Sequence, residues 1–232
     1  MKMRIKISLS LLMALLSLSG CITLRPFPIN ARAENLKIDP AAKLLLNVAI
    51  VIPDPMGNRV IETSRRYNIY GMEMNNTTQD RTSMFGERGA PVGRELSRVA
   101  GDVFSQVFVQ SLTLRQPPQP GEYDAVVEVR ISQTHMMTVT RSSIGSSKLE
   151  SEVSLDYEIT VLDNQGVEIF NKKARTRTEK SNVQGFNVTE QYMDGIGALL
   201  SNLVTDVAKE AGLAVYASEE VNRYANRLKS SP

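Results

Sequence analysis

The chain has 232 residues, with 27 basic and 25 acidic side chains, a single cysteine and no tryptophan. This length suits one ordinary domain with a real hydrophobic core, and one cysteine excludes a fold held together by internal disulfides. Aromatic residues make up only 6% of the chain, which argues against a sugar-binding platform of exposed rings.

The first 20 residues follow the order of a secretory signal. Three positive charges precede an apolar core at 7–18, and small residues then lead into Cys21. That core is shorter than the roughly twenty residues that a membrane-spanning helix needs. Removing residues 1–20 takes away three basic side chains and no acid, which leaves 24 basic against 25 acidic, a net charge of −1. The remaining chain therefore has no charge bias that would favour nucleic acid.

Residues 18–21 (LSGC) resemble a bacterial lipobox, whose cysteine is lipidated and becomes the mature N-terminus. The resemblance implies a lipid on Cys21. Ile22 follows, whereas an aspartate there would resemble an inner-membrane retention signal, so we expect an outer-membrane lipoprotein that faces the periplasm. The alternative is an ordinary signal peptide cut at the A-x-A pattern of 31–33, which lies some thirteen residues past the apolar core.

The sequence thus divides into a signal peptide at 1–20, a tether at 21–42 and one domain at 43–232. Three prolines in the tether argue against regular structure, and a segment of this kind would let the domain stand off the lipid surface: Pro26, Pro28 and Pro40. No second long apolar run follows, so no transmembrane helix is expected after the signal.

The domain begins with strand patterns. Residues 43–52 (KLLLNVAIVI) are apolar and β-branched, which predicts a buried central strand, and 60–70 predict a weaker one. The polar stretch 71–90 has no period and predicts a long surface loop. Such a loop is either floppy or binds a partner, and in the second case its apolar side chains would make the contact: Met72, Met74, Met84 and Phe85.

Two amphipathic helices are expected. Residues 91–112 carry apolar side chains at steps of three and four, and 189–211 do the same, with Gly212 as a stop. A shorter helix at 218–229 is expected to cap the core. Two glycines weaken the second helix or let it pack closely on the sheet: Gly195 and Gly197.

Strands at 125–139 and 153–161 follow from clean alternation of apolar and polar residues. If the alternation holds to the end of the first strand, its apolar face includes four further residues: Gln133, His135, Met137 and Val139. Residues 141–148 predict a flexible connection between the two strands.

A turn at 163–166 predicts that 153–161 forms a hairpin with 167–178. With a two-residue loop the register pairs Ile159 with Phe170 and places opposite charges across from each other, as in Asp156 with Lys173 and Glu152 with Arg177. We therefore expect the basic run of the second strand to be a salt-bridged, solvated face rather than a polyanion site: Lys172, Lys173, Arg175, Arg177 and Lys180.

The order of elements predicts an α+β fold, a two-layer sandwich with a mixed, mostly antiparallel sheet of about four to five strands and two main helices on one face. A lipobox, a tether, a strand, a helix such as 96–112 (LSRVAGDVFSQVFVQSL), a three-strand meander and a closing helix is similar, in element order, to several envelope lipoproteins. These are the lipopolysaccharide-assembly lipoprotein that plugs the outer-membrane translocon, the pel-type export ring lipoprotein, the YajG-type lipoproteins and the soluble part of the curli secretion channel.

No motif points to catalysis. His135 is the only histidine, it has no nucleophile motif nearby, and with Cys21 lipidated it is a lone candidate metal ligand. We expect no enzyme activity, no cofactor and no metal. The expected function is an accessory or assembly factor that binds another envelope protein. The alternatives are a ring-forming channel subunit, which could be a homo-oligomer, and a lipid- or glycan-binding module; a hydrolase would have to lose its activity on His135→Ala.

Overall fold

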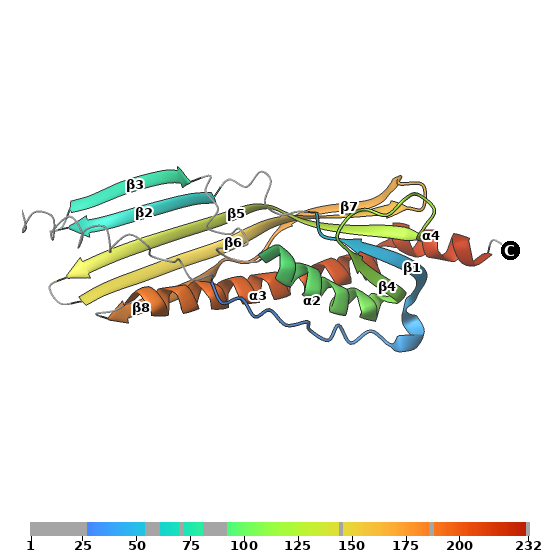
Figure 1. The fold of residues 1–232 in the computed structure, drawn as a ribbon, viewed down its shortest axis with the longest axis horizontal. Coiled ribbons are helices and arrows are strands. Elements are labelled where there is room, and N and C mark those ends of the chain that lie inside the picture. Colours follow the sequence, from blue (N-terminus) through green and yellow to red (C-terminus); the bar gives the residue numbers. More distant parts are fainter. Residues whose placement is uncertain are drawn as a thin grey trace, which may run out of the picture.

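The computed structural model describes residues 27–53, 61–69, 72–80, 92–143, 146–185 and 188–230. These residues form an elongated α+β molecule, in which helices lie along one face of a long twisted sheet (Figure 1). The expected fold class is therefore confirmed. One continuous apolar core lies between the helices and the sheet, and it also includes residues of the N-terminal segment.

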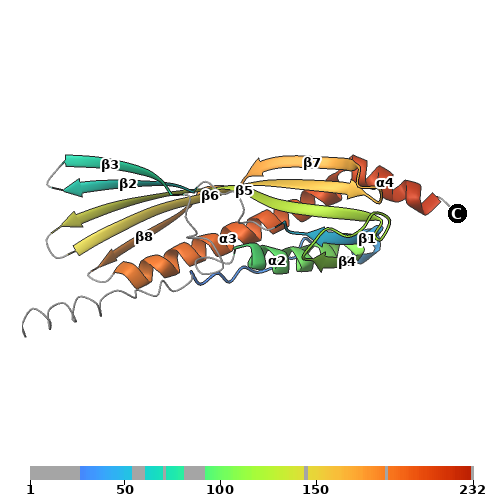
Figure 2. The same ribbon diagram turned by 45° about the horizontal axis from the view of Figure 1, so that its top comes forward.

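Eight strands make up the sheet within the described residues, more than the four to five expected. Two long antiparallel strands, β5 and β6, run through the whole sheet and carry different neighbours at their two ends (Figure 2). One half has the order β7-β6-β5-β1-β4 and the other has the order β8-β6-β5-β2-β3. The bounds are β1 Leu44–Val51, β2 Ile61–Ile69, β3 Met72–Asp80, β4 Phe108–Leu114, β5 Ala125–Ser143, β6 Ser146–Asp163, β7 Glu168–Arg175 and β8 Glu179–Gly185.

The first strand is central, as expected, because β1 pairs in parallel with β4 on one side and β5 on the other. The strand expected at 60–70 is confirmed as β2. The loop expected at 71–90 is wrong for the residues described there, because β3 pairs antiparallel with β2 from Met72 to Asp80. Cross-strand pairing lets this polar stretch form a strand although its sequence shows no alternating pattern.

The first helix, α2 (Val92–Val107), buries the expected apolar stripe but ends five residues early. Residues from Phe108 onward form β4, parallel to β1. The apolar spacing does not mark this change, because Val107 and Phe108 are both completely buried, one on the helix and one on the strand. The run FVQSLTL instead forms backbone hydrogen bonds with β1, as the neighbouring strand of the sheet.

The second main helix, α3 (Val188–Ala217), continues through Gly212. A Cβ at this position would lie 2.5 Å from Val103 Cγ1 and 3.0 Å from Leu36 Cδ1. Gly212 therefore allows α3 to approach α2 closely, and it does not end the helix. Gly195 has a related role at the sheet, where a Cβ would lie 2.5 Å from the Ser181 hydroxyl of β8.

The terminal helix, α4 (Glu219–Ser230), caps one end of the core, as expected. It buries one face against the rest of the domain, and the Tyr224 hydroxyl joins two connections of the sheet. That hydroxyl donates to the carbonyl oxygen of Asp124 at 2.7 Å and accepts from the backbone nitrogen of Asn164 at 3.3 Å. The start of β5 and the β6–β7 turn are thereby held together.

A register shift in β5 reverses the expected side of His135. The pairing with β6 slips between Ile131 and Gln133, and a bulge of this kind turns the following residues over. Thr134 and Met136 are buried, while His135 lies on the open face of the sheet. The expectation that His135 shares the apolar face of the strand is therefore wrong.

The β6–β7 hairpin forms, but its register differs from the expected one by two residues. Ile159 faces Lys172, and Phe170 faces Val161. The Asp163 carboxylate accepts from the backbone nitrogens of Gln165 and Val167, each at 2.9 Å, and this lengthens the turn. A slip of two residues keeps every side chain on its own face, so the alternation pattern could not reveal it.

After β7 the chain crosses to the other half of the sheet at Thr176. Its backbone nitrogen donates to the Leu155 carbonyl oxygen at 2.9 Å, and its hydroxyl accepts from the Leu155 nitrogen at 3.0 Å. The chain then forms β8, which pairs with the first part of β6 and was not expected. The flexible connection expected at 141–148 is largely strand, since β5 reaches Ser143 and β6 begins at Ser146.

Candidate functional site

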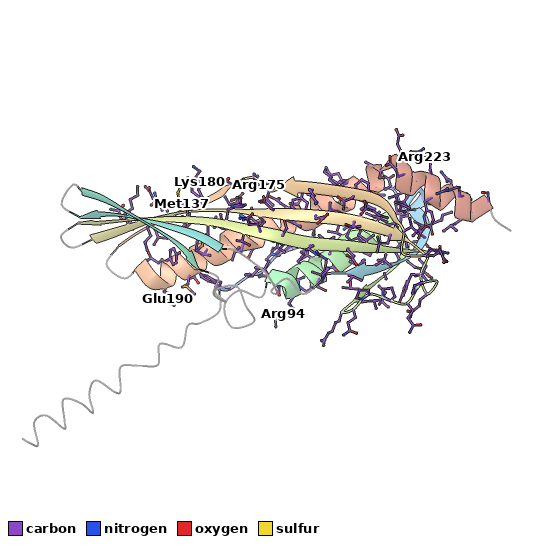
Figure 3. The ribbon with its side chains drawn as sticks, turned by 90° about the horizontal axis from the view of Figure 1, so that it is seen from above. Arg94, Met137, Arg175, Lys180, Glu190 and Arg223 are labelled. Atoms are coloured by element: carbon purple, nitrogen blue, oxygen red, sulfur yellow. The ribbon has the colours of Figure 1, made fainter. Side chains whose placement is uncertain are left out.

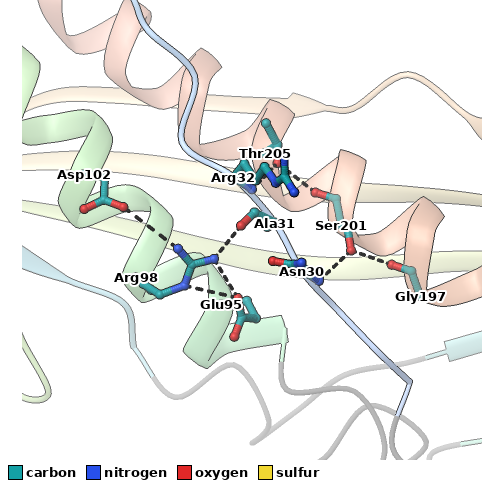
Figure 4. A network of polar contacts seen from close by, with 9 residues as sticks. All are labelled: Asn30, Ala31, Arg32, Glu95, Arg98, Asp102, Gly197, Ser201 and Thr205. Carbon is teal, nitrogen blue, oxygen red and sulfur yellow. Dashed lines mark hydrogen bonds and ion pairs between the residues drawn. The ribbon is translucent and has the colours of Figure 1, made fainter.

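The segment from Phe27 to Ile38, here called the N-terminal strap, packs on the two long helices (Figure 4). The expectation of a free tether over 21–42 is therefore wrong from Phe27 onward. Phe27 and Ala31 are 4% and 1% exposed. Burial alternates along the strap, with apolar side chains inward at positions 27, 29, 31 and 33. This period of two is the signal in the sequence that could have revealed a packed, extended segment.

Two hydroxyls of α3 hold one side of the strap. The backbone nitrogen of Asn30 donates to Ser201 Oγ at 2.8 Å, and that of Arg32 donates to Thr205 Oγ1 at 3.2 Å. Each hydroxyl also donates to a carbonyl oxygen of its own helix, Ser201 to Gly197 at 2.7 Å and Thr205 to Ser201 at 2.9 Å. Because these positions are four residues apart on one helical face, they match the spacing of alternate strap amides.

Arg98 of α2 holds the other side of the strap. Its Nη2 donates to the Ala31 carbonyl oxygen and forms an ion pair of 2.9 Å with Glu95. The Asp102 carboxylate lies 3.9 Å from Nη1. The two acids stand one turn before and one turn after Arg98, so they orient its guanidinium group toward the strap.

The distal part of the strap is fixed by side chains of both helices. The Gln106 side-chain amide of α2 accepts from the Leu36 nitrogen at 2.9 Å and donates to the Glu34 carbonyl oxygen at 3.0 Å. Lys209 of α3 pairs with the Glu34 carboxylate at 2.5 Å. At the other end a Cβ on Gly197 would overlap the carbonyl oxygen of Pro28, so this glycine permits the strap to touch the helix backbone.

The open face of the sheet carries a three-residue polar cluster made of His135, Asp156 and Arg175. Arg175 binds the Asp156 carboxylate with two nitrogens, at 2.5 and 3.0 Å, and His135 Nε2 lies 2.8 Å from the same carboxylate. The Arg175 hydrogen bond, with a smaller contribution from His135, lowers the pKa of Asp156 from 3.8 to about 2. The hydrogen bonds of His135 among the described residues go to these two groups, at 2.8 Å to Asp156 and 3.0 Å to Arg175, so the cluster holds a carboxylate between two basic side chains.

This cluster predicts a pH dependence of stability. Because the pKa of Asp156 is lower in the folded chain than in the unfolded one, its carboxylate stabilises the fold above about pH 4, and this contribution is lost as the pH falls toward 2. After allowance for solvent screening, the lowered pKa corresponds to roughly 1 kcal/mol. We expect Asp156→Asn to flatten the unfolding free energy over this range, measured by denaturant titration at several pH values. Arg175→Gln should remove most of the same slope, and an unchanged slope in both variants would contradict the assignment.

The basic run is confirmed as a salt-bridged face. Arg175 and Lys180 project from one side of the molecule, opposite Arg94 and Glu190 (Figure 3). Ion pairs join four of the five expected residues to acids: Lys173 to Glu158 at 3.5 Å, Arg175 to Asp156 at 2.5 Å, Lys180 to Glu152 at 2.6 Å, and Arg177 to both Glu179 at 2.7 Å and Asp206 at 3.2 Å.

The helix side of β6 carries a second polar contact. The Tyr157 hydroxyl, on a side chain only 1% exposed, donates to the Glu210 carboxylate of α3. Burial raises the pKa of Tyr157 above its usual range. Burial also raises the pKa of the neighbouring Asp206, while the positive charge of Arg177 lowers it by a smaller amount. These groups tie the helix layer to the sheet.

Of the five site residues expected from sequence, two lie in the described part of the chain. Cys21, Met84 and Phe85 lie outside the described residues. Met72 and Met74 belong to β3, where they pair in register with Ile69 and Tyr67 of β2. Among the described residues no group of three or more histidine, cysteine or acidic side chains is placed to hold a metal ion. None of the helices described has the length and apolar character needed to cross a membrane.

Comparison with known proteins gives similarity at the level of structure alone. No protein-family model matches the chain, and no curated protein matches it. Among solved structures, it is similar to a neuraminyllactose-binding hemagglutinin homolog from Helicobacter pylori, with a TM-score of 0.45, 10% identity and coverage of 89% of this chain and 97% of that one.

Two further solved structures are bacterial lipoproteins. A minor lipoprotein from Acinetobacter baumannii has a TM-score of 0.34, 8% identity and coverage of 77% of this chain and 95% of that one. Lipoprotein GNA1162 from Neisseria meningitidis has a TM-score of 0.29, 12% identity and coverage of 70% and 98%. Likeness this distant carries no functional argument, so the function is argued below from the residues of this chain.

Proposed function

We propose that this chain is a non-catalytic lipoprotein of the bacterial outer membrane, anchored by a lipid on Cys21 and facing the periplasm. The sequence LSGC at 18–21, at the end of a short apolar core, supports the anchor, and Ile22 supports the outer membrane. A lipobox cysteine, by resemblance, carries several acyl chains, which hold a protein at a membrane far more firmly than one.

The observation that carries this proposal furthest is the strap. A free tether from Cys21 to Lys43 could extend about 70 Å, whereas the six residues from Cys21 to Phe27 reach at most about 20 Å. Because the strap is fixed on α2 and α3, the anchor would hold the domain close to the membrane, near the part of α3 around Gly197. The domain would then stay within about 20 Å of the membrane surface.

A domain held close to the membrane suits contact with a partner that is itself fixed in the envelope. We propose that the chain is an accessory or assembly factor that binds another envelope protein during export or envelope biogenesis. The proposed contact residues are the methionines of β3 and the two apolar residues that follow: Met72, Met74, Met84 and Phe85. Methionine side chains adapt well to a protein surface.

The test of the anchor is Cys21→Ser in the full chain, expressed in a bacterium with a labelled fatty acid. The unsubstituted chain should carry the label and remain with the outer membrane after a high-salt wash, while the variant should lose both. Ser19→Ala, two residues earlier, is the control and should retain both. An unlabelled but membrane-bound chain would contradict a lipid anchor.

The partner contact is tested separately by crosslinking in cells. A photoreactive residue at position 74 or 85 should give a defined covalent product with one envelope protein. The same residue at Lys173, on the salt-bridged face, is the control and should not give that product. Products that are the same at all three positions would contradict the proposed contact.

The ring-forming subunit remains a second proposal with one change. An edge at 43–52 cannot serve, since both sides of β1 are already paired, but β7 is an outer strand. For a lipid- or glycan-binding module, the described residues offer an open cleft of about 480 Å³ between β7 and α4, lined by Ile169, Glu220, Arg223, Asn226 and Arg227. This cleft lies on the surface, whereas that hypothesis requires a cavity between the helices and the sheet.

A further inference from the structure

Strand β4 is an outer strand with an unusual surface. It contains no charged residue in its seven positions, FVQSLTL. Val109 and Leu112 are 53% and 54% exposed, and Leu45 on the neighbouring β1 is 55% exposed. Half-exposed apolar side chains thus lie along an outer strand, whose free backbone groups can pair with another strand.

The other outer strands in the described part of the sheet contain charged residues. β3 has Glu73 and Asp80, and β8 has Glu179 and Lys180. β7 carries three basic residues within four positions: Lys172, Lys173 and Arg175. Charged side chains on an edge are the usual means by which proteins prevent unwanted strand pairing. The lack of charge on β4 therefore marks it as the strand suited to pairing.

We propose that β4 pairs antiparallel with β4 of a second copy of this chain. A symmetric pair places each strand opposite itself, so a strand with several charges of one sign would bring like charges together near the axis, which destabilises a sheet. β7 would bring its lysines and arginine together, while β4 brings only uncharged residues together. The two β7-β6-β5-β1-β4 halves then form one continuous sheet across the two-fold axis.

The symmetry fits the position of the strap. Antiparallel pairing within one sheet requires a two-fold axis normal to the sheet, which keeps the helices of both copies on the same face. Both straps, packed on those helices, then lie on one side of the dimer. Two lipid anchors could reach the same membrane from that side, although this last step rests on the proposed function and the strand pairing does not.

The first test is the mass of the full-length protein in detergent, measured by analytical ultracentrifugation over a range of concentrations. The unsubstituted chain should be a dimer, and Leu112→Lys should weaken dimerisation at least roughly tenfold, because it brings two lysines close together near the two-fold axis. Val167→Lys is the matched control, since Val167 is 59% exposed and lies outside β4, and it should remain dimeric. A monomer throughout, or a dimer that is insensitive to Leu112→Lys, would overturn the proposal.

The second test locates the contact. Residues directly opposite in an antiparallel pair have Cα atoms about 4.5–5.5 Å apart, which is within disulfide range. Single substitutions Gln110→Cys, Ser111→Cys and Leu112→Cys cover the positions near the axis, and at least one should give a disulfide dimer under mild oxidation. Val167→Cys and the unsubstituted chain should not. If β4 is covered by a strand of another protein, none of the three forms the dimer, and the proposal fails.

Discussion

Phe27→Ala is expected to release the N-terminal strap from the helices without unfolding the sheet. Phe27 is 4% exposed and belongs to the core, and replacing a buried phenylalanine by alanine costs about 3 kcal/mol or more. The strap lies at one end of the described chain, so the loss should appear as local opening. The strap amides of Asn30, Arg32 and Leu36 should exchange about a hundredfold faster.

Hydrogen exchange followed by mass spectrometry measures this effect, because each of those amides is bonded to a helix side chain. Leu213→Ala is the control, since Leu213 is 39% exposed on α3, and it should leave strap exchange unchanged. Rapid strap exchange already in the unsubstituted protein would show that residues 27–38 are a free tether after all.

Gly197→Ala is expected to destabilise the protein, although alanine is the better helix former. In an open helix position this substitution should stabilise by about 1 kcal/mol. Here the new Cβ would overlap the Pro28 carbonyl oxygen, and forcing an extra group into a packed site costs about 1–3 kcal/mol. The sign of the change therefore reports whether the strap touches α3.

The unfolding free energy from denaturant titration decides this sign. Asn202→Ala, at an exposed position of the same helix, is the control and should be neutral or slightly stabilising. Stabilisation by Gly197→Ala equal to the open-helix value would contradict the close approach of the strap.

The fold class followed from the sequence because the main elements have strong periods. The stripe of α2 and the alternation of β6 each bury one face as expected. The errors lie where a local pattern fits two structures. Phe108 continues the apolar spacing of α2, yet it belongs to β4, and only pairing with β1 distinguishes the two. His135 changes face because of one register shift that leaves no mark in the sequence.

The strap was missed for a different reason. Its prolines argue against regular structure. The segment is extended but pairs with none of the described strands, so strand patterns in the sequence do not predict it. Its contacts come from α2 and α3, which are 60 or more residues away in sequence. The alternation of Phe27, Ile29, Ala31 and Ala33 was present, but its meaning depends on a groove that only the assembled helices create.

The most direct test of the account is mass spectrometry of the N-terminal peptide of the protein purified from bacterial membranes. We expect the mature chain to begin at Cys21 and to carry a diacylglycerol on the sulfur, with the strap residues intact. A chain that begins after Ala33 instead would lack Phe27, Ala31 and the strap bonds to Ser201 and Thr205. That result would contradict both the lipid anchor and the role of the strap in holding the domain at the membrane.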